Sequence, residues 1–565
     1  DDYAELLLPD DLISQFSIIQ DVRNGMATEK CVDVEIIGWL YQFYISEKKD
    51  EVFASKGKVK KEDIPAATQL FTPRWIVEYM VQNTVGKLWL QNNPKSKLRD
   101  HMPYFIESPS ATTDDYLKIN SVEDITLLDQ ACGSGHILVY GFELLSKIYE
   151  EQGYNESDIP KLIIEKNLHG FEIDTRAAQL AGLALMLKAR QYYRRVFKKD
   201  ITPNIICYQD LKVNEDEIKG IFKAVDETLS ESLLYDLKIM QQATNLGSLI
   251  IPHTSAKELE RIRVSIANKA DSTDLFHRHN LRGILQAVVQ LNALSRNYHC
   301  VVDNPPYMGD SKMNPYLSDF IKTNYPSSRL DLMTCFMESG LIALKENGYL
   351  GMINQHSWMF ISSYRELREK LIDGFYFESL LHLGPRTFPE IGGEVVQSTS
   401  FVIRNIIREN DKSVFLRLID YRNTTDKSEA TIENLKQHKI TDYFEISSSK
   451  FKQIPNSNFC YWFTENVIDN FKEKKIDDIC KTKAGIVSGN DADFLRIWSE
   501  VCFQNIDLHL NSFEEAETAV WVPINKGGSK RRYYGNLEYV INHNNLWKEG
   551  RTNKSVRRGD PDFYF

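Results

Sequence analysis

Residues 125–145 read ITLLDQACGSGHILVYGFELL: a short apolar strand, then a glycine-rich turn, then a helical stretch. The pattern continues in NLHGFEIDTRAAQLAGLALMLKA at 167–189 and in the strand-like PNIICYQDL at 203–211. Strands that alternate with helices in this way are typical of a parallel sheet covered by helices on both faces. The sequence therefore predicts an α/β fold with a doubly wound parallel sheet.

The rest of the chain is predicted to add helices and further strands. Residues 215–297 carry long helical patterns with little strand signal, and we interpret them as a helical insertion. Beyond residue 410 the pattern becomes irregular, and a further domain is expected to start near residue 479. The remaining strands are expected in HCVVDNPPYMG (299–309), GYLGMINQHSWMF (348–360), FESLLHLG (377–384) and TSFVIRN (399–405).

The region before the first strand is predicted to be helical. In VEIIGWLYQFYISE at 34–47, apolar residues recur at helical spacing, and the charged run KKDE follows. We expect a helical N-terminal module that ends near residue 60. In TQLFTPRWIVEYM at 68–80, Thr72 is placed to cap a helix whose first position suits Pro73.

The composition is that of an ordinary globular chain. Of 565 residues, 68 are Lys or Arg and 79 are Asp or Glu, and this formal charge of −11 argues against a uniformly basic DNA-coating protein. No apolar run approaches the roughly 18 residues of a membrane span, and the eight cysteines form no C-x-x-C pair. We expect a reducing, cytoplasmic setting without membrane association. Because the chain opens on Asp1 and stops at Phe565, we also expect it to be part of a longer protein.

Two strand ends together predict an adenosine-bearing cofactor. Asp129 ends the first strand, and Gly133 and Gly135 let the backbone approach a ligand beside the N–H groups of a helix start. A glycine pair after a strand is by itself more often a plain turn. The second strand, however, ends with Glu172 and Asp174, and an acid there is suited to hydrogen-bond ribose hydroxyls. For Glu172 a solvated strand end is the alternative, and the spacing of the two features favours the cofactor.

The segment VVDNPPYMG at 301–309 predicts a site for a planar amine. Two prolines after Asn304 remove two backbone donors and fix the local chain. The amide oxygen of Asn304 and the carbonyl of Pro305 are then placed to accept both amino hydrogens. Tyr307 offers a face on which a base taken out of a duplex stacks. An Asn-Pro turn with a half-buried tyrosine is the alternative, and the nearby cofactor pattern argues against it.

These motifs resemble, in their order, those of the gamma-class, S-adenosylmethionine-dependent DNA adenine N6-methyltransferases. Where that class has Pro before Ala-Cys, this chain has Gln130. The segments at 39–54, 301–314 and 381–402 are most similar to the PglX family of bacterial BREX phage-defence systems. The resemblance covers about residues 30–500 and rests on FTPRWI (71–76), DQACGSGHIL (129–138), FEID (171–174), QDL (209–211) and NPPY (304–307).

The resemblance implies a Rossmann-like methyltransferase core between an N-terminal helical module and a C-terminal target-recognition domain, which would be incomplete in this chain. The segment KAGIVSGNDADFLRIW at 483–498 looks like the opening of that domain. The expected division is 1–60, the N-terminal module; 61–214, the cofactor-binding half of the core; 215–297, the helical insertion; 298–410, the catalytic half; 411–478, a connecting region; and 479–565, the start of the target-recognition domain.

The resemblance also implies a set of residues for the cofactor, S-adenosylmethionine. Glu172 would hold the ribose hydroxyls, Ile173 would pack on the adenine ring, and Asp210 would accept from the adenine amino group. Thr72 would lie near the methionine carboxylate. The methionine part would be lined by Asp129, Ala131, Gly133 and Gly135.

A second implied set grips the target adenine: Asn304, Pro305, Pro306 and Tyr307. Phe388 matches an aromatic residue that closes the other face of the base in relatives, and a core or loop phenylalanine is the alternative there. The reaction implied is direct in-line transfer of a methyl group from sulfonium to N6, aided by orientation and desolvation. Cytosine C5 methylation would need a Pro-Cys loop, and the sequence contains no Pro-Cys dipeptide.

The last 45 residues are the predicted place for double-stranded DNA. Residues 521–565 contain nine basic and four acidic residues, interleaved with Tyr and Trp, which suits phosphate contacts beside base contacts. A solvated charged face is the alternative. The basic residues we assign to DNA are Lys530, Arg531, Arg532, Arg557 and Arg558. The resemblance further implies other BREX proteins as partners in the bacterial cytoplasm.

Two other functions compete with a methyltransferase alone. A fused restriction-modification enzyme would need a metal-binding Pro-Asp and Glu-x-Lys set, which Pro9-Asp10 and Glu47-Lys48-Lys49 fit formally but at an unfavourable spacing. A DNA-recognition subunit without turnover is the other alternative, and the intact NPPY argues against it. H-E-x-x-H, G-x-x-x-x-G-K-[ST] and the deaminase H-x-E pattern with P-C-x-x-C are absent from the sequence, so we predict no metal site.

Overall fold

A computed structural model gives the structure of the chain, which forms two compact units, Asp1–Ile468 and Asp469–Phe565. The structure describes residues 11–12, 14–25, 36–55, 57–109, 115–270, 275–388, 396–439, 441–474, 476–481, 485–510, 512, 515, 518–528, 530–531, 534–549 and 556–557.

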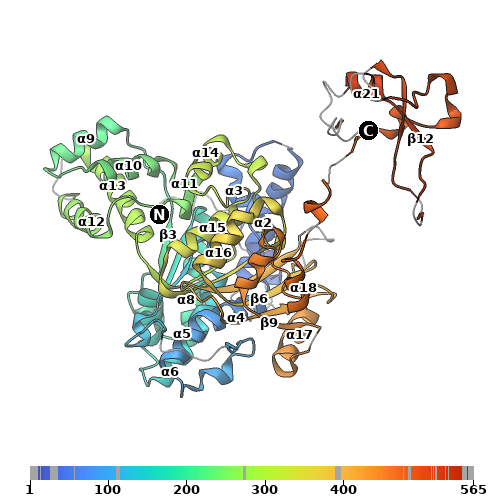
Figure 1. The fold of residues 1–565 in the computed structure, drawn as a ribbon. Helices are drawn as coiled ribbons and strands as arrows, with labels where there is room; N and C mark the ends of the chain where they lie inside the picture. The colour runs from blue at the N-terminus through green and yellow to red at the C-terminus, as the bar shows by residue number, and fades with distance from the viewer. Residues whose placement is uncertain are drawn as a thin grey trace. The chain divides into compact units, whose positions relative to one another are not determined.

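The first unit is built on a nine-stranded sheet with the order β3-β2-β1-β4-β5-β7-β6-β8-β9 (Figure 1). The strands from β3 to β5 are parallel, β7 lies antiparallel between β5 and β6, β8 is parallel to β6, and β9 is antiparallel. The doubly wound α/β prediction is confirmed. The strands are β1 Leu127–Asp129, β2 Leu168–Glu172, β3 Asn204–Cys207, β4 Tyr298–Asp303, β5 Leu344–Gln355, β6 Tyr376–Gly384, β7 Ser398–Arg404, β8 Ser413–Arg417 and β9 Tyr443–Ile446.

Helices cover both faces of this sheet. In Figure 1, α4, α5 and α6 lie below the strands, whereas α14, α15 and α16 lie above them. Because both faces are covered, the central strands are buried along their whole length and lack the alternation of a half-exposed strand. The helices around the sheet are α4 Arg74–Val81, α5 Lys87–Asn92, α6 His136–Glu151, α7 Ile159–Leu162, α8 Thr175–Tyr192, α14 Pro315–Asn324, α15 Leu332–Ile342, α16 Arg365–Gly374, α17 Thr424–Gln437 and α18 Glu465–Asn470.

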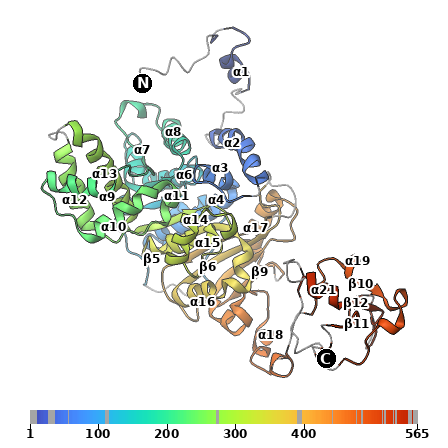
Figure 2. The same ribbon diagram turned by 90° about the horizontal axis from the view of Figure 1, so that it is seen from above.

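Further helices precede the core and interrupt it. The N-terminal helices are α1 Ile18–Gly25, α2 Ile36–Ala54 and α3 Ile64–Thr68. The stretch predicted as a helical insertion forms a group of helices that lies together in both views (Figures 1 and 2). Its members are α9 Glu215–Ala224, α10 Glu231–Ile239, α12 Ala256–Ala270 and α13 Leu275–Leu294. The short helix α11 Ala243–Leu246, from the same stretch, lies apart from them and next to α14.

The charged run at 48–51 lies inside α2, which continues to Ala54, and Lys48, Asp50 and Glu51 are exposed. Two local predictions differ from the structure. Thr72 does not cap the next helix: α4 begins at Arg74, Pro73 takes the N-cap position, and no side chain caps it. The irregular region after residue 410 contains β8 and β9, which are five and four residues long and so give only a weak periodic signal.

The second unit carries a small antiparallel sheet with the order β10-β12-β11. Among the residues that the structure describes in this unit, one apolar cluster contains the buried side chains of Leu495, Ile541, Leu546 and Val556. Its elements are α19 Asp491–Phe494, β10 Leu495–Ile497, β11 Trp521–Ile524, β12 Tyr539–Asn542 and α21 His543–Glu549. In the part of the chain that the structure describes, we find no helix with both the length and the apolarity needed to span a bilayer.

Candidate functional site

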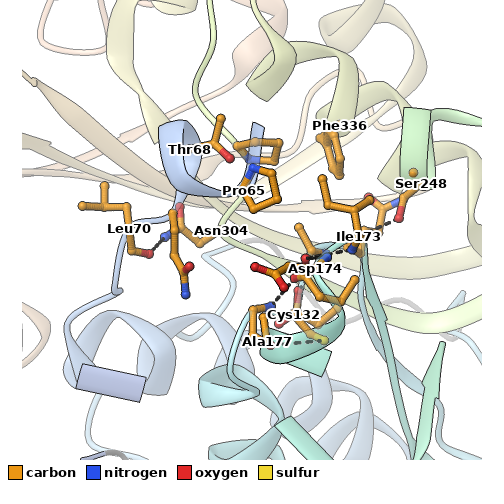
Figure 3. A pocket seen from close by; sticks show the side chains of 18 of the residues that line it. Pro65, Thr68, Leu70, Cys132, Ile173, Asp174, Ala177, Ser248, Asn304 and Phe336 are labelled. Atoms are coloured by element: carbon orange, nitrogen blue, oxygen red, sulfur yellow. Dashed lines mark hydrogen bonds between the residues drawn. The ribbon is translucent and has the colours of Figure 1, made fainter. Parts of the chain in front are cut away.

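A cavity opens at the carboxyl ends of β1, β2 and β4, where a doubly wound sheet usually binds its ligand. The empty space in the cavity and its open mouth together is about 1060 Å³. Figure 3 shows Leu70 and Asn304 on one side of the cavity, and Ile173 and Ser248 on the other. The walls come from residues 42, 64, 65, 68–72, 129–134, 136, 137, 172–174, 177, 245–249, 304, 306, 332 and 336.

The loop after β1 is shaped by two glycines in the left-handed region. Gly133 has φ 51° and Gly135 has φ 86°, conformations that favour residues without a Cβ. At Gly135 a Cβ would also lie 3.0 Å from the Cα of Ala181 on α8. The turn is fixed by Cys132, whose N–H donates to the carbonyl of Phe171 at 2.9 Å, and α6 begins directly after it. The glycine loop predicted from the sequence therefore has the expected shape.

Glu172 lies at the end of β2 and faces this loop. Its Oε2 accepts from the Gly133 N–H at 2.8 Å, and its Oε1 accepts from the N–H groups of Ile173 at 2.8 Å and Asp174 at 2.9 Å. Burial raises the pKa of Glu172, and the three backbone donors work against that rise because they favour the charged form. The side chain lines the cavity as a buried acceptor with capacity for a further hydroxyl donor.

Asp174 is held from the N-terminal helix α2. Its Oδ2 accepts from the hydroxyl of Tyr41, and its Oδ1 accepts from the Arg176 N–H at 2.9 Å. The pKa of Tyr41 is raised, mainly by burial and to a smaller extent by the hydrogen bond to Asp174. The hydroxyl therefore stays protonated and remains a donor. The N-terminal helix is thereby attached to the rim of the cavity. The sequence pattern did not single out Tyr41.

Asp129 and Asp303 meet at the carboxyl ends of the paired strands β1 and β4. Asp129 accepts from the Ala131 N–H at 3.2 Å and Asp303 from the Gln130 N–H at 2.6 Å. Burial first, and then the neighbouring carboxyl, raises the pKa of Asp129, and burial raises the pKa of Asp303. A second negative charge beside the first is unfavourable in this buried place, so we infer that the pair of carboxyls holds a proton.

Asn304 follows directly on β4, and its amide has a defined direction. Its Nδ2 donates to the carbonyl of Leu70 at 2.9 Å and to Oγ1 of Thr72 at 2.9 Å. Its Oδ1 is buried and has no hydrogen-bond partner among the described residues. A buried acceptor without a donor costs free energy, and native proteins keep one chiefly where a ligand completes it. This orphaned oxygen, like those of Gln42 and Gln130 in the same cavity wall, indicates a place for a hydrogen-bond donor of a ligand.

The remaining residues of the NPPY motif differ in their position relative to the cavity. Pro306 lines the cavity, whereas Pro305 is buried beside it. Tyr307 is half-buried against the main core, and its hydroxyl donates to the carbonyl of Ile353 at 3.1 Å. Burial raises the pKa of Tyr307, so the phenol stays neutral.

Five predicted ligand contacts are not among the residues that line the cavity: Gly135, Asp210, Pro305, Tyr307 and Phe388. Asp210 accepts from Lys61 and also from the N–H of Thr244 at 2.9 Å, so its carboxylate already has partners. Phe388 is 2% exposed and belongs to the main apolar core, which is the alternative the sequence left open. Their assigned roles toward the cofactor and the target base stay predictions.

The residues predicted to contact DNA lie in the second unit. Lys530 and Arg531 are exposed, and Arg531 forms an ion pair with Glu538 at 3.1 Å. Arg557 is exposed, and its backbone forms an isolated antiparallel β-bridge with Val487. Arg532 and Arg558 lie outside the described residues. Whether these side chains bind DNA stays a prediction.

The structure describes only one half of the sequence match to a nuclease metal site. Pro9-Asp10 lies outside the described residues. The Glu47-Lys48-Lys49 part lies in α2, where Lys48 pairs with Glu51 at 3.3 Å and Lys49 donates to the carbonyl of Gln69 at 2.9 Å. Within the described residues, no group of three or more His, Cys, Asp or Glu side chains is arranged to hold a metal ion.

Sequence comparison identifies relatives of this chain. A family model described as Eco57I restriction-modification methylase matches residues 166–388, and one described as the DNA-methyltransferase domain of MmeI matches residues 112–216. The adenine-specific methyltransferase BrxX of Escherichia coli O9:H4 (strain HS) is 40% identical over 597 residues, which cover 100% of this chain and 48% of that protein. The adenine-specific methyltransferase PglX of Lacticaseibacillus casei (strain Zhang) is 34% identical over 587 residues, covering 99% of this chain and 48% of that protein. The chain is thus a relative, over its whole length, of the BrxX and PglX proteins, which are named as adenine-specific methyltransferases.

The family resemblance seen in the motifs is thus confirmed. The chain spans about half the length of the BrxX and PglX relatives it matches. Among solved structures, the restriction-modification enzyme LlaGI in complex with a DNA substrate mimic has a TM-score of 0.44 at 15% identity, over 76% of this chain and 30% of that chain. MmeI in complex with DNA has a TM-score of 0.39 at 16% identity, over 70% of this chain and 42% of that chain.

Proposed function

We propose that this relative of BrxX and PglX is the catalytic part of a site-specific DNA methyltransferase that uses S-adenosylmethionine to methylate N6 of adenine. The observation that carries the proposal is the buried, partnerless Oδ1 of Asn304 beside a cavity whose far side is lined by Glu172 and Ile173. An exocyclic amine supplies the donor that this oxygen lacks. The names of the BrxX and PglX relatives support adenine as the substrate.

The residues around the cavity fit S-adenosylmethionine. Glu172 keeps acceptor capacity for a ribose hydroxyl, and Ile173 offers an apolar surface for the adenine ring. The glycine loop lets a ligand approach the backbone at Ala131 and Gly133, beside the start of α6. When bound, the cofactor supplies an electrophilic methyl group.

The chain's own residues then hold the amine for attack. Oδ1 of Asn304 accepts one amino hydrogen, and the carbonyl of Pro305 is placed next to it in the chain to accept the other. Acceptance of both hydrogens makes the nitrogen more pyramidal and its lone pair more available. Tyr307 stacks on the base, and its bonded hydroxyl holds the ring in one orientation. Catalysis of this kind rests on orientation and exclusion of water.

We further propose double-stranded DNA and other BREX proteins as partners, in the bacterial cytoplasm, with the methyl mark distinguishing host from phage DNA. The basic residues Lys530, Arg531 and Arg557 of the second unit are the proposed phosphate contacts, within a target-recognition domain. The names of the BrxX and PglX relatives support the BREX assignment.

The direct test is to map modified bases in cellular DNA. The full-length protein is expressed with its neighbouring defence proteins, and single-molecule sequencing locates N6-methyladenine. We expect methylation in one short sequence motif and its loss in Asn304→Ala. DNA without the mark in the wild-type strain, or with an unchanged mark in the variant, would contradict the proposed function.

A further inference from the structure

Thr72 connects the glycine loop with the Asn304 loop. Nε2 of His136, the first residue of α6, lies 2.8 Å from the carbonyl oxygen of Thr72. Since a carbonyl only accepts, the histidine nitrogen is the donor. On its other side, Oγ1 of Thr72 accepts from Nδ2 of Asn304 at 2.9 Å. Thr72 is 3% exposed, so water has little access to replace either bond.

The contacts of Asn304 settle which way its amide points. The two Nδ2 hydrogens are used by the Leu70 carbonyl and by Thr72 Oγ1. A flipped amide would place its oxygen 2.9 Å from the Leu70 carbonyl oxygen, where two acceptors repel and no hydrogen bond forms. The Leu70 carbonyl and Thr72 Oγ1 therefore fix the orientation in which Nδ2 of Asn304 faces them and Oδ1 has no partner.

The local sequence explains why Thr72 is available for this contact. Pro73 takes the N-cap position of α4, and no side chain caps that helix. The Thr72 hydroxyl is thus not used for capping and faces the Asn304 loop instead. The ring of His136 packs on Phe71 with centroids 4.2 Å apart, which holds the segment before α4 against the start of α6.

We propose that Thr72 is a positioning residue for Asn304: its hydroxyl fixes the carboxamide so that Oδ1 meets the amino group of the target base, and His136 holds Thr72 in place. The inference rests on the proposed adenine methylation. The terminal torsion of asparagine is broad, so the amide needs two acceptors on its nitrogen to stay in one orientation. Small errors of alignment at a reacting group lower the rate strongly.

This role differs from a contact with the methionine carboxylate, which the resemblance implies for Thr72. If Thr72 contacts the cofactor, replacing it lowers the affinity for the cofactor. If Thr72 contacts Asn304, replacing it lowers the rate of methyl transfer after both ligands are bound. The two roles therefore predict effects on different measurements.

The test uses the full-length protein with its partner proteins, and a duplex that contains the motif found by sequencing. Thr72→Val removes the acceptor at nearly constant volume, Thr72→Ala removes it with less steric demand, and Thr72→Ser keeps it. Single-turnover methylation at saturating S-adenosylmethionine should fall about 10- to 100-fold in Thr72→Val and Thr72→Ala, the cost of a buried donor left without its acceptor. Thr72→Ser should recover the rate to within about threefold of wild type, and calorimetric affinity for S-adenosylmethionine should change less than about threefold in all three variants.

Three results would overturn the inference. In the first, Thr72→Val and Thr72→Ala both keep the wild-type rate. In the second, cofactor affinity falls while the saturated rate does not, which assigns Thr72 to the cofactor. In the third, Thr72→Ser loses as much rate as Thr72→Val, so the hydroxyl is not what matters. A wild-type protein that transfers no methyl group at all contradicts the proposed function itself, and this inference with it.

Discussion

Glu172 accepts a hydrogen bond from the Gly133 N–H at 2.8 Å, so the acid at the end of β2 holds the glycine loop that follows β1. Two further N–H groups, of Ile173 and Asp174, bind its other oxygen. One carboxylate thus fixes the loop on one side of the cavity and keeps capacity for a ligand hydroxyl. Loop shape and ligand binding depend on the same side chain.

Glu172→Ala should weaken S-adenosylmethionine binding about 10- to 100-fold, since it removes a charged acceptor and loosens the glycine loop. Isothermal titration calorimetry measures this directly. The control is Asn304→Ala, which should bind the cofactor with nearly wild-type affinity because the amide points to the target side. Equal affinity in wild type and Glu172→Ala would show that Glu172 has no part in the cofactor site.

Asn304→Asp should reduce methylation at least about 100-fold, the order of effect for a deleted oriented hydrogen-bonding group. The variant keeps an oxygen acceptor, but an aspartate cannot donate to the Leu70 carbonyl and Thr72 Oγ1. The carboxylate would turn away from these acceptors. Transfer of radioactive methyl to duplex DNA measures the rate, and near-normal activity in the variant would refute the amide geometry.

Asp303→Asn should flatten the pH dependence of folding stability. The pKa values of Asp129 and Asp303 are raised in the folded protein, so the native state binds more protons than the unfolded chain, in which an aspartate has a pKa of about 4. Below the unfolded-state pKa, the pair therefore makes its whole contribution to the free energy of unfolding. This contribution is lost as the pH rises toward the raised pKa values of the folded state.

An asparagine at position 303 can still accept from Gln130 and can donate to Asp129 in place of the shared proton. Thermal unfolding of both proteins between about pH 5 and pH 8 tests this pair. The expected result is a smaller drop in melting temperature for Asp303→Asn than for wild type. A parallel drop in the two proteins would mean that the carboxyls share no proton.

Phe388→Ala should lower the free energy of unfolding by about 3–5 kcal/mol, the usual cost of removing a buried phenylalanine. The side chain is 2% exposed within the main core, which favours packing as its role. Denaturant unfolding measures the change. Phe388→Leu is the matched control and should cost less, since it conserves most of the apolar volume. If Phe388→Ala keeps full stability but abolishes methylation, the residue acts on the target base.

Removing basic side chains in the second unit should weaken DNA binding in a salt-dependent way. Lys530→Ala and Arg557→Ala change two exposed cations, and removing one cation that binds a phosphate should reduce the slope of log affinity against log salt by about 1. Fluorescence anisotropy of a labelled duplex at several salt concentrations gives the slope. Lys219→Ala, on α9 of the helical insertion, is the control and should keep the wild-type slope. Identical slopes in all four proteins would remove the second unit from the DNA-binding surface.

Much of the core could be predicted because its signals are local. The alternation of strands and helices from residue 125 to 211 predicted β1 to β3, and the glycine loop lies where the motif placed it, between β1 and α6. The short strands β8 and β9 could not be predicted, since five or four residues without clear alternation gain their pairing only from the sheet edge they join.

The sequence alone determined the order of the elements, the glycine turn and the family resemblance, because turn chemistry, apolar periodicity and motif order are properties of neighbouring residues. Only the tertiary structure decided which distant groups meet. Thr72, predicted as a helix cap, became the acceptor of an amide 232 positions away, and Tyr41 reached Asp174 from another helix. These contacts arise because the sheet brings the ends of β1, β2 and β4 together. Polar groups buried there need a hydrogen-bond partner, either in the protein or in a ligand.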